Sequence, residues 1–382
     1  MKLNKKSELN LKSFLGKEFK SIEAKMLNKK FLLSLITLFV LLFTSCNAAK
    51  NTTQSEVLSP IPYRVGNKWG YCDNSKKIVI PTIYDDANPF SETLAAVKIK
   101  GKWGYIDTDG KMVIKPIYDG SCDMENIAGT FTDGLAPVEL KGKWGFVDTK
   151  GKMVIQAIYN DPCNIPRPFS EGLASVKVDG KRCFINTKGD VVLTLPEDFY
   201  DAGSFSEGLA WAVLTYAGSE GCFYKWGFIN KDGSTAIPFV YDSVDSFQEG
   251  LAAVGIKGKY GFIGEKGNVV IQPTYDAAYS FTEGLAAVKI NGEMTGKWGF
   301  IDMKGNMVIP AVYDDAHTFY EDLALVSVNG VNGEHGFIDR EGKVVIQPVY
   351  DWAYDFSNGL ARVELNGKWG FIDKSGTQYW EN

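Results

Sequence analysis

The sequence predicts an all-β protein, a tandem array of about nine antiparallel β-meander repeats over residues 61–382. Three observations support this prediction: one motif recurs along the chain, hairpin-type turns separate its apolar runs, and no helical spacing of apolar residues follows residue 60. The motif is centred on one position, here called the Trp slot, whose occupants lie 34 to 44 residues apart. The occupants are Trp69, Trp103, Trp144, Arg182, Trp226, Tyr260, Trp298, His335 and Trp369.

Residues 90–119 show how one repeat is expected to fold. Three strands are expected, at 94–99, 103–107 and 112–115. Lys100-Gly101 forms the first turn, because glycine accepts a positive φ, and Asp107 to Gly110 fits a type I turn. Pro116 ends the third strand by removing a donor. The Tyr-Asp pair and the F-x-EGL segment that follow can add a short fourth strand.

Two arrangements of the repeats are compatible with this pattern. An open, curved, solenoid-like array accepts any number of units, and an incomplete first unit suits its end. A closed β-propeller-like ring is the alternative, with F-x-EGLA, KWGYID and VIxP as strands of one radial blade. We favour the open array, because nine blades are many and 34 residues are few for four strands.

The first 60 residues are expected to direct the protein to its cellular location. Residues 31–45 form an apolar run that follows Lys29 and Lys30 and suits a secretory signal better than a membrane span. Residues 1–45 are therefore a targeting segment, with Met26 as the expected true start. The segment ends in Phe43-Thr44-Ser45-Cys46, which resembles a bacterial lipobox and implies acyl chains on Cys46. An uncleaved signal anchor is the alternative, and 46–60 reads as a polar tether.

Composition excludes several function classes. Residues 1–45 carry nine lysines and three glutamates, whereas the rest of the chain holds 32 basic and 43 acidic residues. An acidic body argues against nucleic acid as a partner. Two histidines in 382 residues argue against a His-rich metal site, and we find no catalytic motif, so we expect no metal, no cofactor and no catalytic residue.

At this point GKWGYID, VI-x-P-x-YD and F-x-EGLA together resemble the WG-repeat (KWG) family of bacterial β-repeat proteins. The resemblance covers 61–382. It is weakest in the fourth unit, where Arg182-Cys183 replaces Trp-Gly, and the first unit lacks its F-x-EGLA segment. The resemblance implies a structural or binding repeat and carries no catalytic residues.

Repeated side chains need a structural explanation first. We expect the Trp slot to build an aromatic ladder between units, with an exposed ligand-stacking row as the alternative. Lysines precede the slot, and acids precede Gly-Leu. A solvated lysine row cross-paired with these acids is the preferred interpretation. A cation site made from the acids is the alternative, although their spacing matches no calcium loop.

Side chains that are not repeated are the candidates for function, because folding of every unit cannot require them. The candidate partner-binding residues are Trp211, Tyr216, Tyr224, Tyr279, Tyr320, Trp352 and Tyr354. Cys122 and Cys163 occupy matching positions four residues after a tyrosine, which makes them the candidate disulfide in an oxidising compartment. Cys72 and Cys183 lie inside strand patterns and read as small buried residues.

These observations predict a non-catalytic, membrane-anchored lipoprotein of the bacterial cell envelope, on its periplasmic side or at the cell surface. It would bind or scaffold a protein or glycan partner, because loops of successive units line one face of a repeat array. A purely structural surface or periplasmic spacer is the second hypothesis. A carbohydrate-active enzyme is a third and less favoured one.

Overall fold

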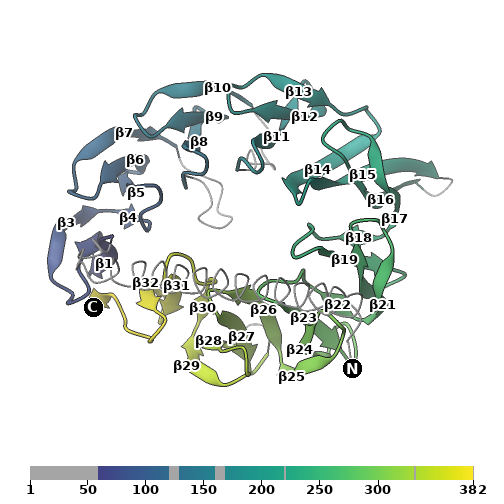
Figure 1. Ribbon diagram of the computed structural model, residues 1–382. Coiled ribbons are helices and arrows are strands. Elements are labelled where there is room, and N and C mark those ends of the chain that lie inside the picture. Colours follow the sequence, from purple (N-terminus) through teal and green to yellow (C-terminus); the bar gives the residue numbers. More distant parts are fainter. Residues whose placement is uncertain (1–58, 120–128, 160–167, 219–220, 331–332, 382) are drawn as a thin grey trace, which may run out of the picture. The chain divides into compact units, whose positions relative to one another are not determined.

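The computed structural model describes residues 59–119, 129–159, 168–218, 221–330 and 333–381. Throughout these residues the regular structure consists of strands, which form nine separate sheets with turns between them, and all strand pairs are antiparallel except β1 with β33. Residues 59–382 are one structural unit, and its sheets follow one another around a ring (Figure 1). Each sheet is called a blade and numbered from blade 1 in chain order.

Blades 2 and 6 to 9 begin just after a Tyr-Asp pair, and a complete blade holds four strands. The strands of blades 1 to 3 are β1 (Ile61–Val65), β2 (Lys68–Cys72) and β3 (Ile78–Tyr84); β4 (Asp86–Ala87), β5 (Leu94–Ile99), β6 (Lys102–Asp107) and β7 (Met112–Tyr118); β8 (Leu135–Leu140), β9 (Lys143–Asp148) and β10 (Met153–Tyr159). The strands of blades 4 to 6 are β11 (Leu173–Val178), β12 (Lys181–Asn186) and β13 (Val191–Thr194); β14 (Phe199–Ser206), β15 (Leu209–Gly218), β16 (Gly221–Ile229) and β17 (Thr235–Tyr241); β18 (Ser243–Val244), β19 (Leu251–Ile256), β20 (Lys259–Gly264) and β21 (Val269–Tyr275). The strands of blades 7 to 9 are β22 (Ala277–Ala278), β23 (Leu285–Ile290), β24 (Lys297–Asp302) and β25 (Met307–Tyr313); β26 (Asp315–Tyr320), β27 (Leu323–Val328), β28 (Glu334–Ile338) and β29 (Val344–Tyr350); β30 (Trp352–Ala353), β31 (Leu360–Leu365) and β32 (Lys368–Asp373), while β33 (Trp380–Glu381) joins blade 1.

The order of strands within a blade follows the chain. In blade 7 the order is β22-β23-β24-β25, with the two-residue strand at the inner edge of the ring and the VIP strand at its outer edge (Figure 1). The predicted short fourth strand is therefore present and is the first strand of its blade. The ring carries the F-x-EGL segments along its inner edge, where they join the first two strands of each blade.

The turns take the conformations that their glycines permit. Glu249 and Gly250 have φ of 55° and 77°, and Lys257 and Gly258 have 52° and 74°. Positive φ at both central residues is what a type I′ hairpin turn requires, and its twist matches that of the flanking strands. The glycine after the Trp slot has a different role. A Cβ on Gly261 would lie 2.5 Å from the carbonyl oxygen of Ile271, so the bulged outer strand of the same blade can approach only glycine.

Blades are joined by one repeated aromatic contact. The aromatic residue two positions after the Trp slot packs on the phenylalanine of the next F-x-EGL segment, as Phe262 packs on Phe281 with ring centroids 4.7 Å apart. The same contact, at 4.7 to 5.1 Å, recurs in the pairs Tyr71–Phe90, Tyr105–Phe131, Phe146–Phe169, Phe184–Phe205, Phe228–Phe247, Phe300–Phe319 and Phe337–Phe356. Nearly all these rings are buried, and they form the centre of the hydrophobic clusters between blades.

The Trp slot contributes to the same interior in a different way from the one expected. Trp144 is 3% exposed and belongs to the cluster between blades 3 and 4. Across the strands of its own blade it faces Tyr159, the tyrosine of the Tyr-Asp pair. The ladder of ring pairs between units therefore belongs to the Phe and Tyr positions. In blade 4 the slot holds a buried ion pair instead, with Arg182 Nη2 2.8 Å from Asp201 Oδ1.

The charged rows pair differently from the preferred interpretation. The lysine before the Trp slot binds the aspartate of its own Tyr-Asp pair, as in Lys68–Asp85, Lys102–Asp119, Lys225–Asp242, Lys259–Asp276 and Lys297–Asp314. The acid before Gly-Leu instead accepts a backbone N–H from the matching turn of the next blade. Glu207 accepts from Gly250 N at 2.9 Å, and Glu249 accepts from Gly284 N at the same distance. This row of glutamates therefore connects neighbouring blades along one side of the ring.

The ring is closed by strand β33. It pairs in parallel with β1, and Tyr63 donates its hydroxyl to Glu381 at 2.7 Å. Arg64 Nε donates to the carbonyl oxygen of Trp369 at 2.6 Å, so the last blade is also bound to the first. Trp69 packs edge-on against Phe371 at 5.7 Å, in place of the Phe pair used elsewhere.

The all-β, nine-meander prediction is confirmed, and the arrangement is the closed ring that the sequence left as an alternative. The preferred open array is not the one observed. The reason is that β33 fills the place left empty by the missing F-x-EGLA segment of the first unit. The expected targeting segment 1–45 and tether 46–60 lie outside the described residues up to residue 58. No helix in the described part of the chain is long and apolar enough to cross a membrane.

Burial separates two tryptophans that the sequence assigned to different roles. Trp144→Ala should destabilise the protein by about 3–5 kcal/mol, the usual cost of removing a buried large aromatic side chain. Trp352 is 42% exposed, so Trp352→Ala should cost much less. Thermal and urea unfolding of both variants measures the difference. Equally large losses would show that Trp352 is part of the core.

The lysine–aspartate pairs predict a loss of stability in acid. Hydrogen bonds from the paired lysines hold the pKa of Asp242, Asp276 and Asp314 below the usual 3.8. The stabilisation is therefore complete above that value and is lost as the pH falls through the lower folded-state values. Lys259→Met should lower the urea midpoint at neutral pH and reduce its fall toward about pH 3. The same acid-induced fall in variant and parent would contradict this assignment.

Candidate functional site

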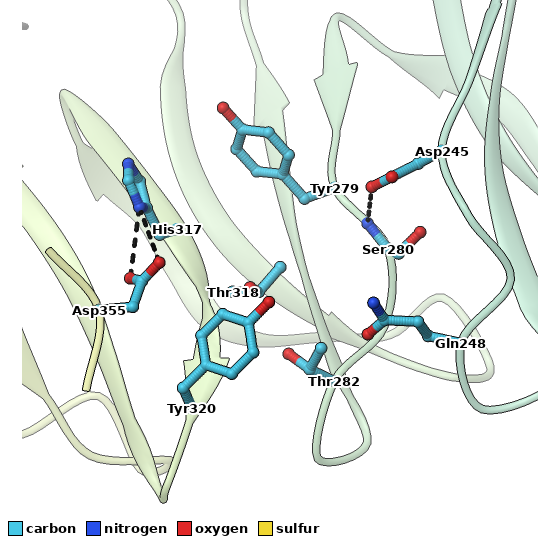
Figure 2. A pocket seen from close by; sticks show the side chains of 9 residues that line it. All are labelled: Asp245, Gln248, Tyr279, Ser280, Thr282, His317, Thr318, Tyr320 and Asp355. Atoms are coloured by element: carbon cyan, nitrogen blue, oxygen red, sulfur yellow. Dashed lines mark hydrogen bonds and ion pairs between the residues drawn. The ribbon is translucent and has the colours of Figure 1, made fainter. Parts of the chain in front are cut away.

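A pocket of 240 Å³ opens among the F-x-EGL segments of blades 6 to 9, at the inner edge of the ring. Its lining is shown in Figure 2 and consists of Asp245, Gln248, Tyr279, Ser280, Thr282, His317, Thr318, Tyr320 and Asp355. All nine lie between the beginning of a blade and its Glu-Gly turn or the equivalent turn. The pocket is therefore assembled from equivalent segments of successive blades.

The local fold explains why these side chains are free to form a pocket. The phenylalanine of each segment, such as Phe281 or Phe319, is fully buried between blades and holds the segment in place. The residue two positions before it is Asp245, Tyr279, His317 and Tyr354 in blades 6 to 9. The residue after it varies as well, from Gln248 through Thr282 and Tyr320 to Ser357. Since blades with such different residues have the same fold, folding does not dictate the pocket lining.

The aromatic wall of the pocket is preorganised. The ring of Tyr279 lies parallel to that of Trp298, with centroids 5.1 Å apart and an interplanar angle of 9°. On its pocket side the His317 ring lies 6.3 Å away at 60°. Tyr320 extends from the end of β26 on the opposite side and is 41% exposed (Figure 2). Two aromatic rings therefore border the pocket, and one of them is held rigidly.

Two carboxylates face each other across the pocket in Figure 2. Both carboxylate oxygens of Asp355 lie 3.3 Å from Nδ1 of His317. Asp245 accepts backbone N–H groups, from Ser246 at 2.8 Å and Ser280 at 3.2 Å. Burial, followed by the nearby charges of Asp315, Asp245 and Asp355, raises the pKa of Tyr279. The potential in this pocket is thus negative, and Tyr279 remains a neutral donor well above physiological pH.

The hydroxyl of Thr282 is buried at the pocket without a hydrogen-bond partner, and Oδ1 of Asp355 is buried with the ion-pair contact to His317 Nδ1 and no hydrogen bond. Thr282 as a whole is 8% exposed. A buried polar atom left unpaired costs about 1–3 kcal/mol, which a ligand with suitable donors would recover. The described residues hold no group of three or more His, Cys, Asp or Glu side chains arranged for a metal ion.

The structure brings only some of the predicted site residues together. Tyr279 and Tyr320 line the pocket. Tyr354 lines a second pocket, of 400 Å³, beside Phe90 and Phe371, and its ring stacks on Trp369 at 5.5 Å. Trp352 lies at the beginning of β30 with its ring 5.2 Å from His335.

The other three predicted aromatics belong to the long β15–β16 hairpin of blade 5. Tyr216 stacks on Phe223 at 5.3 Å, and Tyr224 packs on Tyr200 at 4.9 Å, both at exposed positions. Trp211 differs, because it is only partly exposed and packs against the core between blades 5 and 6. It lies so close to Gly203 that a Cβ there would be 2.3 Å from the indole nitrogen. This hairpin is separate from the pocket.

The cysteines divide between described and undescribed residues. Cys46 and the candidate disulfide pair Cys122 and Cys163 lie outside the described residues, so those assignments remain predictions. Cys72 and Cys183 are buried free thiols in strands β2 and β12, as the sequence indicated. Burial raises the pKa of Cys72 to about 12, which makes this thiol unreactive at neutral pH.

Sequence reasoning missed most of the polar pocket residues, including His317, Asp245, Asp355 and Thr282. A usable signal was present. Aligning the repeats on F-x-EGL shows one position that is aspartate, tyrosine, histidine and tyrosine in four successive blades, beside strictly repeated neighbours. Its tyrosines, Tyr279 and Tyr354, were predicted because they are aromatic residues outside the repeat pattern, whereas Asp245 and His317 at the same position were missed because they are not aromatic candidates of that kind.

A closed ring of nine four-stranded or near four-stranded blades defines a β-propeller, here built from sequence repeats. The model of the "WG containing repeat" matches the chain eight times between residues 69 and 369, at 69–103, 103–144, 144–181, 184–214, 226–260, 260–293, 298–331 and 336–369. These matches cover more than half of the chain, so the chain belongs to the WG-repeat family.

Several solved structures are similar to this chain, and the first of them agrees on the fold with a TM-score above 0.5. A eukaryotic initiation factor is similar over 84% of this chain and 94% of its own, with 13% identity and a TM-score of 0.57. Hsv2 of Kluyveromyces lactis covers 65% of this chain and 93% of its own, with 9% identity and a TM-score of 0.39. The Pan2 WD40 domain of Neurospora crassa covers 65% of this chain and 89% of its own, with 12% identity and a TM-score of 0.38. No protein with a curated description matches the sequence.

Proposed function

We propose that this chain is a non-catalytic binding and scaffolding protein of the bacterial cell envelope. Its propeller would present the inner-edge pocket to a protein partner. The observation that carries the proposal is that the pocket lining varies among blades of identical fold, so these polar and aromatic side chains are free to serve recognition.

The physical properties of the pocket support binding rather than catalysis. Tyr279 is held flat against Trp298, and Phe281 and Phe319 hold the segments from within the core, so the surface is preorganised. Preorganisation lowers the entropic cost of association. The only histidine at the pocket has its Nδ1 directed to Asp355, and the lining contains no cysteine or lysine. A glycan is the second candidate partner, favoured by exposed Tyr216 and Tyr224, because sugar rings stack on flat aromatic surfaces.

Partner capture tests this function. The full chain carrying a photo-crosslinker near the pocket should capture the same envelope protein in repeated experiments, and Tyr320→Ala should abolish that capture. Val312→Ala, an exposed apolar substitution on the outer strand β25, is the matched control and should leave capture unchanged. A glycan captured through Tyr216 and Tyr224 instead would favour the second candidate. Capture that is insensitive to all of these substitutions would reject a role for both surfaces.

Membrane anchoring through Cys46 is the second part of the proposal, and it rests on the lipobox-like sequence 43–46. Acyl chains on the thiol would hold the protein at the membrane. Cys46→Ala should therefore release the protein from the membrane fraction or leave it unprocessed, as measured by fractionation and mass spectrometry. Unchanged membrane retention with a normal mature mass would argue decisively against lipidation.

A further inference from the structure

We propose that the pocket of blades 6 to 9 binds one positively charged side chain, arginine or lysine, presented by the partner. This inference rests on the proposed binding function and specifies what the site recognises. Three independent features of the pocket support it: its two carboxylates, its aromatic wall, and its buried oxygen atoms with unused hydrogen-bonding capacity.

The first feature is charge. The aspartates of the Tyr-Asp pairs that precede blades 6, 7 and 8 each bind a lysine; they are Asp242, Asp276 and Asp314. Asp245 differs, since its hydrogen bonds in the structure come from backbone N–H groups, which carry no net charge. Asp355 faces it with His317 as its neighbour, and that imidazole compensates charge only when protonated. The lining thus holds two carboxylates and no lysine or arginine, so a cation is the group that complements this pocket.

The second feature is the aromatic wall. A guanidinium or ammonium group is attracted to the face of a tyrosine ring, and the attraction grows when water is excluded. Tyr279 and Tyr320 border the pocket, and Tyr279 is fixed by Trp298. A volume of 240 Å³ lies below the ~300 Å³ at which drug-sized ligand sites begin, and it suits one long side chain.

The third feature is the set of buried oxygen atoms with unused hydrogen-bonding capacity. The Thr282 hydroxyl is buried and lacks a hydrogen-bond partner, and Figure 2 shows it on the side of the pocket facing Tyr320. Asp355 Oδ1 is buried as well, and its contact in the structure is the one with His317 Nδ1 at 3.3 Å. A guanidinium group brings five N–H donors and no acceptor, so it can satisfy both atoms. A sugar hydroxyl brings an additional lone pair with each donor and leaves the charges of Asp245 and Asp355 uncompensated.

The ring already contains such a contact elsewhere. Where blades 9, 1 and 2 meet, the guanidinium of Arg362 lies 5.2 Å from the centre of the Trp369 ring and 5.8 Å from that of Trp69. It also lies 3.3 Å from Asp86, at the beginning of a blade. An arginine held between aromatic rings and an inner-edge aspartate is thus a stable arrangement in this protein. At the pocket of blades 6 to 9 the aspartates and rings are present, and the cation would come from outside.

The two histidines of the chain make a direct test possible. His317 lines the pocket, whereas His335 is 4% exposed and is not part of its lining. In the full-length chain labelled at histidine Cε1, a tripeptide with a central arginine or lysine and blocked ends should shift the His317 NMR signal saturably. The His335 signal should not move. The corresponding glutamine tripeptide is the neutral control, and cellobiose tests the sugar alternative.

Two variants test the residues, and one controls for charge. Asp245→Asn and Asp355→Asn should each weaken binding of the basic tripeptide by about tenfold or more, the loss of one charge-assisted contact. Glu265→Gln removes an acid in a turn of blade 6 outside the pocket lining and should have no effect. An unchanged His335 signal shows that each variant is folded. Affinity should also fall as salt is raised, because the attraction is electrostatic.

Three outcomes overturn the inference: no saturable shift with either basic tripeptide, an equal shift with the glutamine tripeptide, or binding of cellobiose that is insensitive to both Asp→Asn variants. The outcome is separable from the proposed function. If basic tripeptides fail while Tyr320→Ala still abolishes partner capture, the pocket binds a partner through other chemistry and only this inference is wrong. If basic tripeptides bind but capture is insensitive to Tyr320→Ala, the cation site exists and the proposed function at this pocket is wrong.

Discussion

The contact between an aromatic ring of one blade and the phenylalanine of the next is the interaction on which the whole ring depends. A single meander of about 35 residues cannot bury both of its faces, so each blade needs a neighbour. The repeated pair, such as Phe228 with Phe247, supplies this burial at nearly the same distance at eight blade junctions. A constant contact fixes a constant angle between blades. A constant angle repeated nine times closes a ring, provided that the two ends can pair.

The same constraint separates fold from function along the inner edge. Blades are joined through the F-x-EGL segment. Its phenylalanine, its Glu-Gly turn and its leucine are needed for this contact, so they repeat from blade to blade. Positions beside the phenylalanine face the inner edge and are not needed for joining. In blades 6 to 9 they carry tyrosine, histidine, aspartate and threonine, and these residues converge on one pocket. A repeat protein of this kind can thus change what it binds, blade by blade, without changing how it folds.

Much of the fold could be predicted from the sequence, because its determinants are local. Turns such as Lys257-Gly258 need positive φ, and proline ends the outer strands, so strands and turns followed from residue types. Closure could not be predicted, because it depends on the angle between blades and on the pairing of β1 with β33, neither of which is a repeat feature. The charged rows were paired wrongly for a related reason, since each lysine finds an aspartate 17 positions later in its own unit.

The candidate site was only partly predictable. Tyr279 and Tyr320 were identified because they interrupt the repeat pattern, but nothing in their spacing indicated that they share a pocket with Asp245 and Asp355. Those four residues come from four blades, and only the curvature of the ring brings them together. The tyrosines of the β15–β16 hairpin interrupt the pattern equally well and lie elsewhere.

Ring closure by β33 has a consequence for how the chain reaches its native state. Tyr63 and Glu381, which hydrogen bond at the closing blade, are 318 positions apart, whereas most other pairings in the molecule join neighbouring strands. Eight blades can therefore assemble from local contacts, while the first blade waits for a segment from the far end of the propeller. Contacts of such long sequence separation form slowly, because the entropy of a very large loop must be lost before they give any stabilisation. Until then the edge of β1 is an unpaired strand, and exposed edges of this kind pair readily with other chains. We therefore expect the pairing of β1 with β33, which closes the ring, to be the slowest step of folding.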